Sequence, residues 1–349
     1  MDKNHKPYED FECWFLDVGQ GTSNVIYLGD GQAIVIDCGP SRSRQTLHFL
    51  NKHVSNIKAL ILSHNDSDHI NGAAGLIGNY IDIIEKIYFL ADGKHGKILE
   101  LLNTYDPDKK ILRERLEKNS NGSKIIYHEG NIKLEVIYPG IISNLEAENA
   151  GRERANQTSA ILKLSCGKKR IIFSGDASII AWEHLTKDYL KEKPFKCDIM
   201  TIPHHAGKIS SGTKDLEAQK KLYTEIIKPQ YGIVSVGTIN NHGHPCSETI
   251  SALIESGVFV LCTQMTQQCC SDLEAIRGIN RIIAQPSFSS RKKLTTISGK
   301  SKNVACIGTI SAEINPKEIK INQLKIHKQN MKLFSKSKVF DPLCKMNPS

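Results

Sequence analysis

The chain lacks any apolar run long enough to cross a membrane. Among its 349 residues there is no stretch of about 18 consecutive apolar side chains, the length a membrane-spanning helix needs. Its first ten residues are polar and contain no apolar segment typical of a secretory signal. Together these absences predict a soluble, cytoplasmic protein without a membrane span.

Aromatic residues are also scarce, at 6% of the chain. Few aromatic side chains are therefore available to stack on the bases of a single-stranded nucleic acid. The charge is basic, with a formal net charge of +9, and residues 316–349 contain eight lysines but only two acids. A basic balance favours polyanionic partners. A solvated tail that only keeps the protein in solution accounts for the same composition.

The ten cysteines contain no CxxC pair and are scattered along the chain. In a reducing compartment such residues are more typical of thiols or metal ligands than of disulfides. Cys262, Cys269 or Cys270, and Cys306 could gather around a structural zinc ion. A disulfide and separate buried thiols are the alternatives.

The segment richest in metal-capable side chains is 64–69, which reads His-Asn-Asp-Ser-Asp-His. It follows the apolar run 59–62 and precedes an expected helix over 70–77, so it lies where a buried strand ends. Open α/β folds place their chemistry at strand ends. A loop so dense in His and Asp is costly to hold together without a cation. The plain alternative is a solvated turn that caps the helix.

Three further strand ends supply His or Asp. The expected strand 170–173 is followed by Asp176, the strand 199–202 by His204 and His205, and the strand 233–236 by a turn containing His244. Each could be an ordinary turn residue taken alone. Four separate strand ends that all deliver metal-capable side chains favour one shared site.

Short strands with interspersed helices predict an α/β fold with a partly antiparallel, sandwich-like core. The first strands are expected at 11–16, 24–28 and 33–36, and a helix at 43–53. Residues 106–123 are charged and predict an exposed helix and loop. Residues 143–157 are polar and predict an insertion or lid.

Seven motifs occur in order between residues 11 and 257: FLDVGQGTS, VIDCG, SHNDSDHINGA, NQTSAILKL, FSGD, PHHAG and NHGHP. This series resembles the metallo-β-lactamase superfamily and, more narrowly, the hydrolase domain of ComEC-type competence proteins, here free-standing. The resemblance implies an αββα sandwich with a small C-terminal extension. The expected parts are a hydrolase domain over 1–257, a Cys-bearing extension over 258–315 and a basic tail over 316–349.

The chain departs from the superfamily's loop, His-x-His-x-Asp-His, at two points. Asp66 replaces the second histidine, as in the competence-type branch, and the third motif has Asn156 and Ser159 where a histidine would fall. Oxygen ligands favour Mn²⁺ or Mg²⁺ over Zn²⁺ relative to an all-histidine site. Two divalent ions are expected, Mn²⁺ or Zn²⁺ first and Mg²⁺ as a further option.

The resemblance implies a two-metal hydrolase that acts on a phosphodiester. One ion would be held by His64, Asp66 and Asp176. The other would be held by Asp68, His69, Asp176 and either His204 or His244, so that Asp176 bridges. A water between the ions would attack phosphorus. His205, or whichever of His204 and His244 is not a ligand, would protonate the leaving oxygen.

Four more residues have expected supporting roles. Ser23 and Asn71 would orient ligands, and Asp17 and Asp37 would brace loops. Asp68, His204 and His205 are the residues expected to be catalytic.

Nucleic acid is the preferred substrate, because the resemblance is to a DNA-processing branch and the chain is basic. The alternatives are a small ester, a lactone, a thioester or an oligonucleotide, since one scaffold serves many reactions. A non-catalytic nucleic-acid-binding module is the rival class. Metal-dependent turnover that is lost in Asp176→Asn would separate an enzyme from a binding module.

Overall fold

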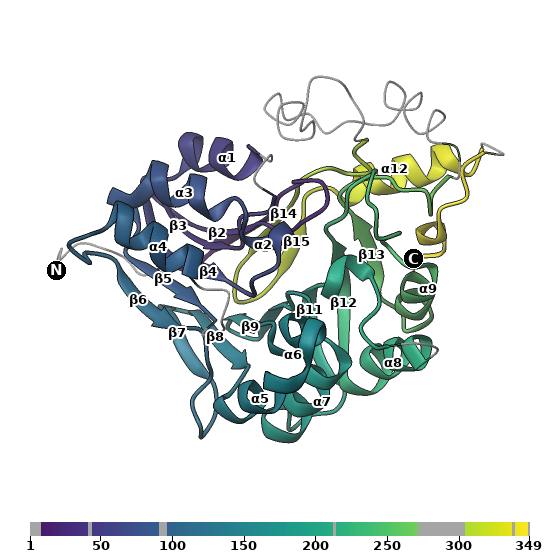
Figure 1. Ribbon diagram of the computed structural model, residues 1–349. Helices are drawn as coiled ribbons and strands as arrows, with labels where there is room; N and C mark the ends of the chain where they lie inside the picture. Colours follow the sequence, from purple (N-terminus) through teal and green to yellow (C-terminus); the bar gives the residue numbers. More distant parts are fainter. Residues whose placement is uncertain are drawn as a thin grey trace.

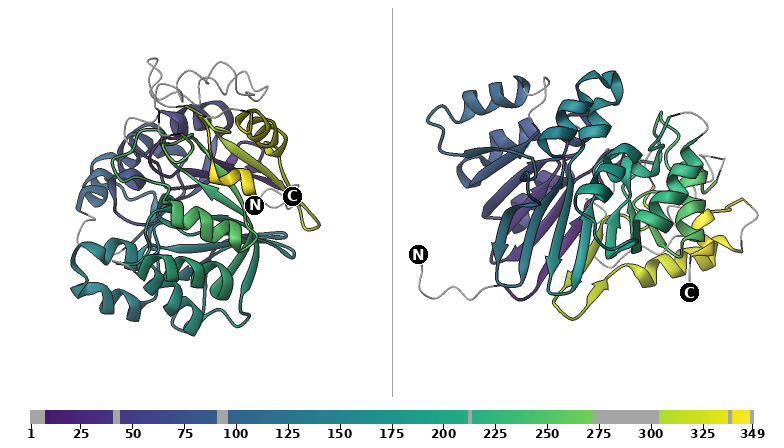
Figure 2. Two further views of the ribbon diagram at one scale, coloured as in Figure 1. Left: turned by 90° about the vertical axis from the view of Figure 1, so that its right-hand side faces the viewer. Right: turned by 90° about the horizontal axis from the view of Figure 1, so that it is seen from below.

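The computed structural model describes residues 8–40, 44–90, 96–211, 214–270, 272, 304–336 and 339–347. Two β-sheets face each other, and helices lie on the outer side of each sheet (Figures 1 and 2). The predicted αββα sandwich is therefore confirmed. No helix in the described ranges is both long enough and apolar enough to cross a membrane.

The first sheet has eight strands in the order β15-β14-β1-β2-β3-β4-β5-β6. Their bounds are Phe11–Phe15 (β1), Asn24–Gly29 (β2), Gln32–Ile36 (β3), Asn56–Leu62 (β4), Lys86–Phe89 (β5), Leu112–Arg115 (β6), Ile310–Ile314 (β14) and Ile319–Ile321 (β15). Helices α1 (Gln45–His53), α3 (Ala73–Tyr80) and α4 (Gly96–Tyr105) lie near its outer face, and the short α2 (Ser67–Ile70) follows β4.

The second sheet has seven strands in the order β13-β12-β11-β10-β9-β8-β7. Their bounds are Lys124–Glu129 (β7), Ile132–Tyr138 (β8), Ile161–Cys166 (β9), Lys169–Phe173 (β10), Phe195–Thr201 (β11), Ile227–Val234 (β12) and Phe259–Cys262 (β13). The accompanying helices are α5 (Ile141–Glu146), α6 (Arg154–Thr158), α7 (Ile179–Asp188), α8 (Asp215–Lys221), α9 (Ser247–Glu255) and α12 (Leu324–Phe334).

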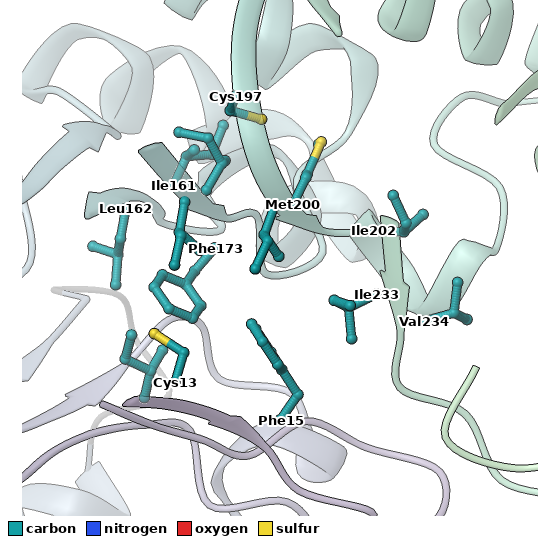
Figure 3. Packing of buried hydrophobic residues seen from close by; sticks show 14 of the residues in the cluster. Cys13, Phe15, Ile161, Leu162, Phe173, Cys197, Met200, Ile202, Ile233 and Val234 are labelled. Atoms are coloured by element: carbon teal, nitrogen blue, oxygen red, sulfur yellow. The ribbon is translucent and has the colours of Figure 1, made fainter. Parts of the chain in front are cut away.

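The alternation of side chains along a strand divides the core into two layers. In β3, Ile34 and Ile36 belong to the cluster between the sheets, while Ala33 and Val35 belong to the cluster under α1, α3 and α4. Figure 3 shows the layer between the sheets, where Phe15 of β1 approaches Phe173 of β10; their ring centroids are 6.2 Å apart. Both β3 and β10 are therefore fixed by the packing of apolar side chains between the two sheets.

Residues beyond 257 belong to both sheets. β13 runs parallel to β12, whereas β14 pairs antiparallel with β1 and thus lies inside the first sheet. From 316 on, the described chain forms β15, α12 and a 3₁₀ turn over Leu343–Met346. The boundaries at 257 and 315 stay a prediction, and strands from both sides of residue 257 are paired.

The structure corrects the prediction for residues 106–123 and adds detail to the prediction for residues 143–157. The exposed helix expected over 106–123 is wrong, because residues 112–115 form β6, an edge strand parallel to β5. The charged side chains that suggested a helix suit an edge strand, which faces solvent. Residues 143–157 fold into short helical turns that lead into α6.

The sheet topology brings the motif loops together. β3 and β4 are parallel, as are β10, β11 and β12, so the carboxyl ends of these strands meet at one edge of each sheet. The loops after these strands carry the candidate site residues.

Candidate metal centre

Three buried histidines are each held through the outer nitrogen of the ring. Nδ1 of His69 lies 2.8 Å from Oδ2 of Asp37, and Nδ1 of His205 lies 2.8 Å from the carbonyl oxygen of Ser235. A carboxylate and a carbonyl only accept, so in both rings Nδ1 carries the proton. Nδ1 of His64 lies 3.0 Å from the hydroxyl of Ser63.

The inner nitrogens of these rings converge on Asp176. Nε2 of His69 is 3.1 Å from Oδ1 of Asp176, and Nε2 of His205 is 3.9 Å from the same oxygen. Nε2 of His64 is 3.6 Å from the other oxygen, Oδ2. Each carboxylate oxygen of Asp176 thus faces a different side of the cluster.

Asp68 completes the group on the second side. Its Oδ2 lies 3.1 Å from Nε2 of His205, which in turn is 3.3 Å from Nε2 of His69. Two sets of ligand atoms come within 4.8 Å of one another among the residues that the structure describes: His64, His69 and Asp176, and Asp68, His69 and His205.

These residues fit divalent metal ions. Nε2 of His64 and Oδ1 of Asp176 are buried and have no hydrogen-bond partner in the described structure. In the neutral rings of His69 and His205, two Nε2 lone pairs face each other beside two carboxylates. Such an arrangement requires a cation, and imidazole with carboxylate suits Zn²⁺, Mn²⁺ or a similar ion.

When no metal is bound, protons on the histidines supply the positive charge that the carboxylates require. Burial alone would lower the pKa of His69, but the carboxylates of Asp176 and Asp37 outweigh it and hold that pKa well above its usual value. Burial would likewise raise the pKa of Asp176, yet the surrounding histidines, His69 first, hold it well below its usual value. Metal and protons therefore compete for this centre.

A strained turn after β11 positions the histidine pair. His204, His205 and Ala206 have φ values of 53°, 54° and 59°, the left-handed region that side chains other than glycine rarely adopt. The turn directs the buried ring of His205 to Asp68 and leaves the ring of His204 partly exposed, with Nε2 at 4.0 Å from Oδ2 of Asp176. Strain of this kind concentrates at functional sites.

The remaining predicted ligands lie at the edge of the cluster. Asp66 is 38% exposed, and its Oδ2 is 3.9 Å from Nε2 of His64. The ring of His244 lies 5.0 Å from that of His204, and its Nδ1 lies 3.4 Å from the amide nitrogen of Gln20. Burial, with His204 nearby, lowers the pKa of His244 to about 3. The structure brings His205, rather than His204 or His244, against Asp68 and His69.

Two serines support the centre through hydrogen bonds that the motifs do not predict. Ser63 donates its hydroxyl to Asp37 at 2.7 Å, and the hydroxyl of Ser159 accepts from the backbone N–H of Asp176 at 2.9 Å. Ser63 directly precedes His64, and this adjacency was the available signal. Asp37 braces its loop as expected and also fixes His69.

The expectation that Ser23 and Asn71 orient ligands finds no support in the described contacts. The hydroxyl of Ser23 bonds that of Thr46 at 2.8 Å, and Asn71 is exposed at the end of α2. Asp17 accepts a hydrogen bond from the amide of Gln264 at 2.7 Å and braces its loop.

The described structure does not gather the side chains expected to hold a structural zinc ion, those of Cys262, Cys269 or Cys270, and Cys306. All four cysteines are free thiols, and among the described residues no three cysteine sulfurs lie within 4.8 Å of one another. The thiol of Cys270 instead donates to the carbonyl oxygen of Asp272 at 3.4 Å. Burial raises the pKa of both Cys262 and Cys306, as expected for buried thiols.

A family model described as the metallo-beta-lactamase superfamily matches residues 16–225. The chain belongs to the metallo-β-lactamase superfamily. It is therefore grouped with metal-dependent hydrolases, and the matched residues include the four buried side chains of the centre (His64, His69, Asp176 and His205) and the partly exposed Asp68.

Two curated relatives of this metallo-β-lactamase chain resemble it weakly in sequence. Recombination protein 2 of Haemophilus influenzae is 23% identical over 231 residues, 64% of this chain and 24% of that protein. ComE operon protein 3 of Bacillus subtilis is 22% identical over 273 residues, 72% of this chain and 32% of that protein. The resemblance to ComEC-type proteins is thereby confirmed. The chain spans about a quarter to a third of the length of these relatives.

Solved structures of the superfamily are more distant. The metallo-beta-lactamase fold protein YhfI from Bacillus subtilis is 15% identical, with a TM-score of 0.43 over 72% of this chain and 96% of that one. The short form of human tRNase Z is 12% identical, with a TM-score of 0.42 over 74% and 93%. Structural similarity this weak says nothing about the activity of this chain.

Proposed function

We propose that this protein is a metal-dependent phosphodiesterase that hydrolyses nucleic acid. The observation that carries the proposal is the convergence of three histidine Nε2 atoms on the two carboxylate oxygens of the buried Asp176, with the carboxylate of Asp68 beside them. A pair of divalent ions held there would activate a water and neutralise charge on phosphoryl oxygens.

The two oxygens of Asp176 suit it to lie between two ions. Oδ2 faces His64, with Asp66 and His204 at the rim, and Oδ1 faces His69 and His205, with Asp68 beside them. We assign His64, Asp66 and Asp176 to one ion, and Asp68, His69, His205 and Asp176 to the other. Fixed Nδ1–H groups keep the rings of His69 and His205 aimed at these positions.

His204 has the position of a general acid. Its ring is 28% exposed, whereas that of His205 is 2% exposed, so His204 is the one that a bound substrate can reach. Its Nδ1 donates to the carbonyl oxygen of Lys208 at 2.6 Å, which leaves Nε2 facing the centre. From there it would donate a proton to the leaving oxygen. His205 is better suited to be a ligand.

Three considerations support a nucleic acid substrate. The relatives are named Recombination protein 2 and ComE operon protein 3, and the first name refers to recombination. The net charge of +9 favours a polyanion. Lys208 lines the pocket next to Asp176 and His204. Hydrolysis of a small ester, lactone or thioester, or binding without turnover, would use the same centre differently.

The test is a panel of substrates with metal-stripped protein to which Mn²⁺, Zn²⁺ or Mg²⁺ is restored. It contains bis-p-nitrophenyl phosphate, p-nitrophenyl phosphate, p-nitrophenyl acetate and a lactone. The proposal predicts preferential turnover of the diester, abolished in Asp68→Ala. Preferential turnover of the acetate or the lactone would contradict it, as would bound metal without turnover of any compound.

A further inference from the structure

A pocket opens directly beside the metal centre, on the side of His204. Asp176 and His204 form one part of its wall, and its volume is about 270 Å³. The rest of the wall comes from Glu153 and Asn156 at α6, the start of α7 and the segment 208–211. Its size is close to the lower end of the range of about 300–1,000 Å³ for small-molecule sites, enough for one ring system and its substituents.

One face of this pocket is apolar. Ile179 and Ile180 at the start of α7 and Ile209 after the histidine turn line it together. The side chain of Ile180 is 39% exposed, so part of this apolar face is in contact with water. A planar ring laid against these side chains would remove that surface from water.

Other parts of the wall offer hydrogen bonds that the described structure does not use. Oδ1 of Asn156 and the hydroxyl oxygen of Ser178 are buried and have no partner there. Ser178 precedes α7 as its N-cap, yet its side chain makes no capping hydrogen bond. Buried polar atoms are nearly always paired, so two of them in one pocket point to a polar ligand.

The charges of the pocket favour a nearly neutral ligand. Apart from Asp176, the charged side chains in its wall are one acid, Glu153, and one base, Lys208. A second phosphate group would meet this carboxylate as well as the ammonium. A nucleoside carries no charge and combines a flat ring with hydrogen-bonding edges, so it matches both the apolar face and the unpaired polar atoms.

We propose that this pocket binds the nucleoside attached to one side of the scissile phosphate. The phosphate would lie at Asp176 and His204, and the base would pack on Ile179 and Ile180, with Asn156 and Ser178 at its edge or sugar. The inference rests on the proposed function and adds to it that the enzyme recognises a nucleotide rather than any diester.

The experiment compares three diesters that release p-nitrophenolate: the p-nitrophenyl esters of thymidine 5′-phosphate and thymidine 3′-phosphate, and bis-p-nitrophenyl phosphate. In each, water adds to phosphorus and the bond to p-nitrophenolate breaks, so only the second substituent differs. One thymidine ester should exceed bis-p-nitrophenyl phosphate in kcat/KM by about 10–200-fold, the effect of one well-matched contact group. Ile180→Ala should lower that ratio by about tenfold.

The matched control is Ile142→Ala. Ile142 is 72% exposed on α5 and does not line the pocket, so the ratio should stay at the wild-type value. A wild-type ratio near one for both thymidine esters would overturn the inference while leaving the phosphodiesterase proposal intact. An equal fall in Ile180→Ala and Ile142→Ala would also overturn it.

Absence of turnover for all three diesters would instead contradict the proposed function. Binding of thymidine, the uncharged nucleoside, to the full-length protein, measured by calorimetry, then tests the pocket separately. Binding that is weakened in Ile180→Ala and unchanged in Ile142→Ala would support a nucleoside pocket. No binding to the wild-type protein would overturn it.

Discussion

At the residue scale, Asp37 determines how His69 faces the centre. Its carboxylate accepts from Nδ1 of His69 and from the N–H and hydroxyl of Ser63. Asp37→Asn keeps the shape, and Asn tolerates the left-handed φ of 61° at this position. Because the amide no longer fixes the tautomer of His69, metal affinity should fall by about 10–100-fold, measured by competition with a chelator.

Asp17→Asn is the control for this prediction. Asp17 is also a buried loop carboxylate, but its Oδ1 accepts from Gln264 rather than from a histidine of the metal centre, and an amide oxygen can still accept there. Its metal affinity should match that of the wild type. Equal affinity in both variants would show that Asp37 does not act through His69.

His204 is expected to act as the acid for poor leaving groups. An alkoxide leaving from DNA needs a proton, whereas p-nitrophenolate leaves without one. His204→Gln should therefore lower kcat for DNA by about 10²–10⁴-fold and change kcat for bis-p-nitrophenyl phosphate far less. Equal losses on the two substrates, with metal content preserved, would exclude the acid role and favour a ligand role.

Sequence motifs were sufficient to find the residues of the centre but not to predict which side chain contacts which. His204 and His205 are adjacent, and only the left-handed turn over 204–206 decides which ring is buried against Asp68. Ser159 stands where the superfamily's third histidine would fall, and its hydroxyl holds the N–H of Asp176. Neither contact follows from a spacing along the chain. The contact of His205 with Asp68 joins loops of the two sheets, and that of Ser159 with Asp176 joins the residues before β9 and after β10.

At the scale of elements, the turn between β10 and α7 fixes the position of the Asp176 carboxylate. Gly175 has φ of +50°, and a Cβ there would lie 2.3 Å from the hydroxyl oxygen of Ser159. Gly175→Ala should lower the free energy of unfolding by about 2–5 kcal/mol, measured by urea denaturation, because the left-handed backbone and the collision both cost energy. Metal affinity should fall too, since Asp176 must shift.

Gly75→Ala in α3 is the matched control. Gly75 is exposed, and a Cβ there would meet only Leu47 at 3.9 Å, an ordinary contact. This variant should raise the free energy of unfolding by about 0.5–1 kcal/mol, because alanine favours a helix. A Gly175→Ala protein as stable as the wild type would contradict the geometry of the turn.

Elements with a strong apolar pattern were predicted well, and the rest depended on tertiary context. The buried strands β3 and β10 lie where their apolar runs indicated. The edge strand β6 reads Leu-Arg-Glu-Arg, a pattern that local propensity cannot assign to a sheet. Its strand conformation depends on the pairing with β5.

At the scale of the whole molecule, β14 ties the end of the chain to its beginning. It pairs with β1 from Phe11↔Ile314 to Phe15↔Ile310, at a position inside the first sheet. A fragment of residues 1–257 would leave β1 as an unpaired edge with buried side chains exposed. It should show no cooperative thermal transition by circular dichroism.

A fragment of residues 1–315 is the comparison. It keeps the pairing of β14 with β1 and loses β15 and α12, whose Phe334 is 1% exposed. It should melt cooperatively, at a lower temperature than the full chain. Cooperative melting of 1–257 would contradict this account and support an independent domain that ends at 257.

The central claim is tested most directly by cleavage of end-labelled single-stranded and double-stranded DNA by the full chain. Metal-stripped protein is compared with protein to which Mn²⁺ or Zn²⁺ has been restored, with Asp176→Asn alongside. The account predicts cleavage by the metal-restored wild type, and none by the stripped protein or by Asp176→Asn. Intact DNA despite bound metal, or equal cleavage by Asp176→Asn, would contradict it.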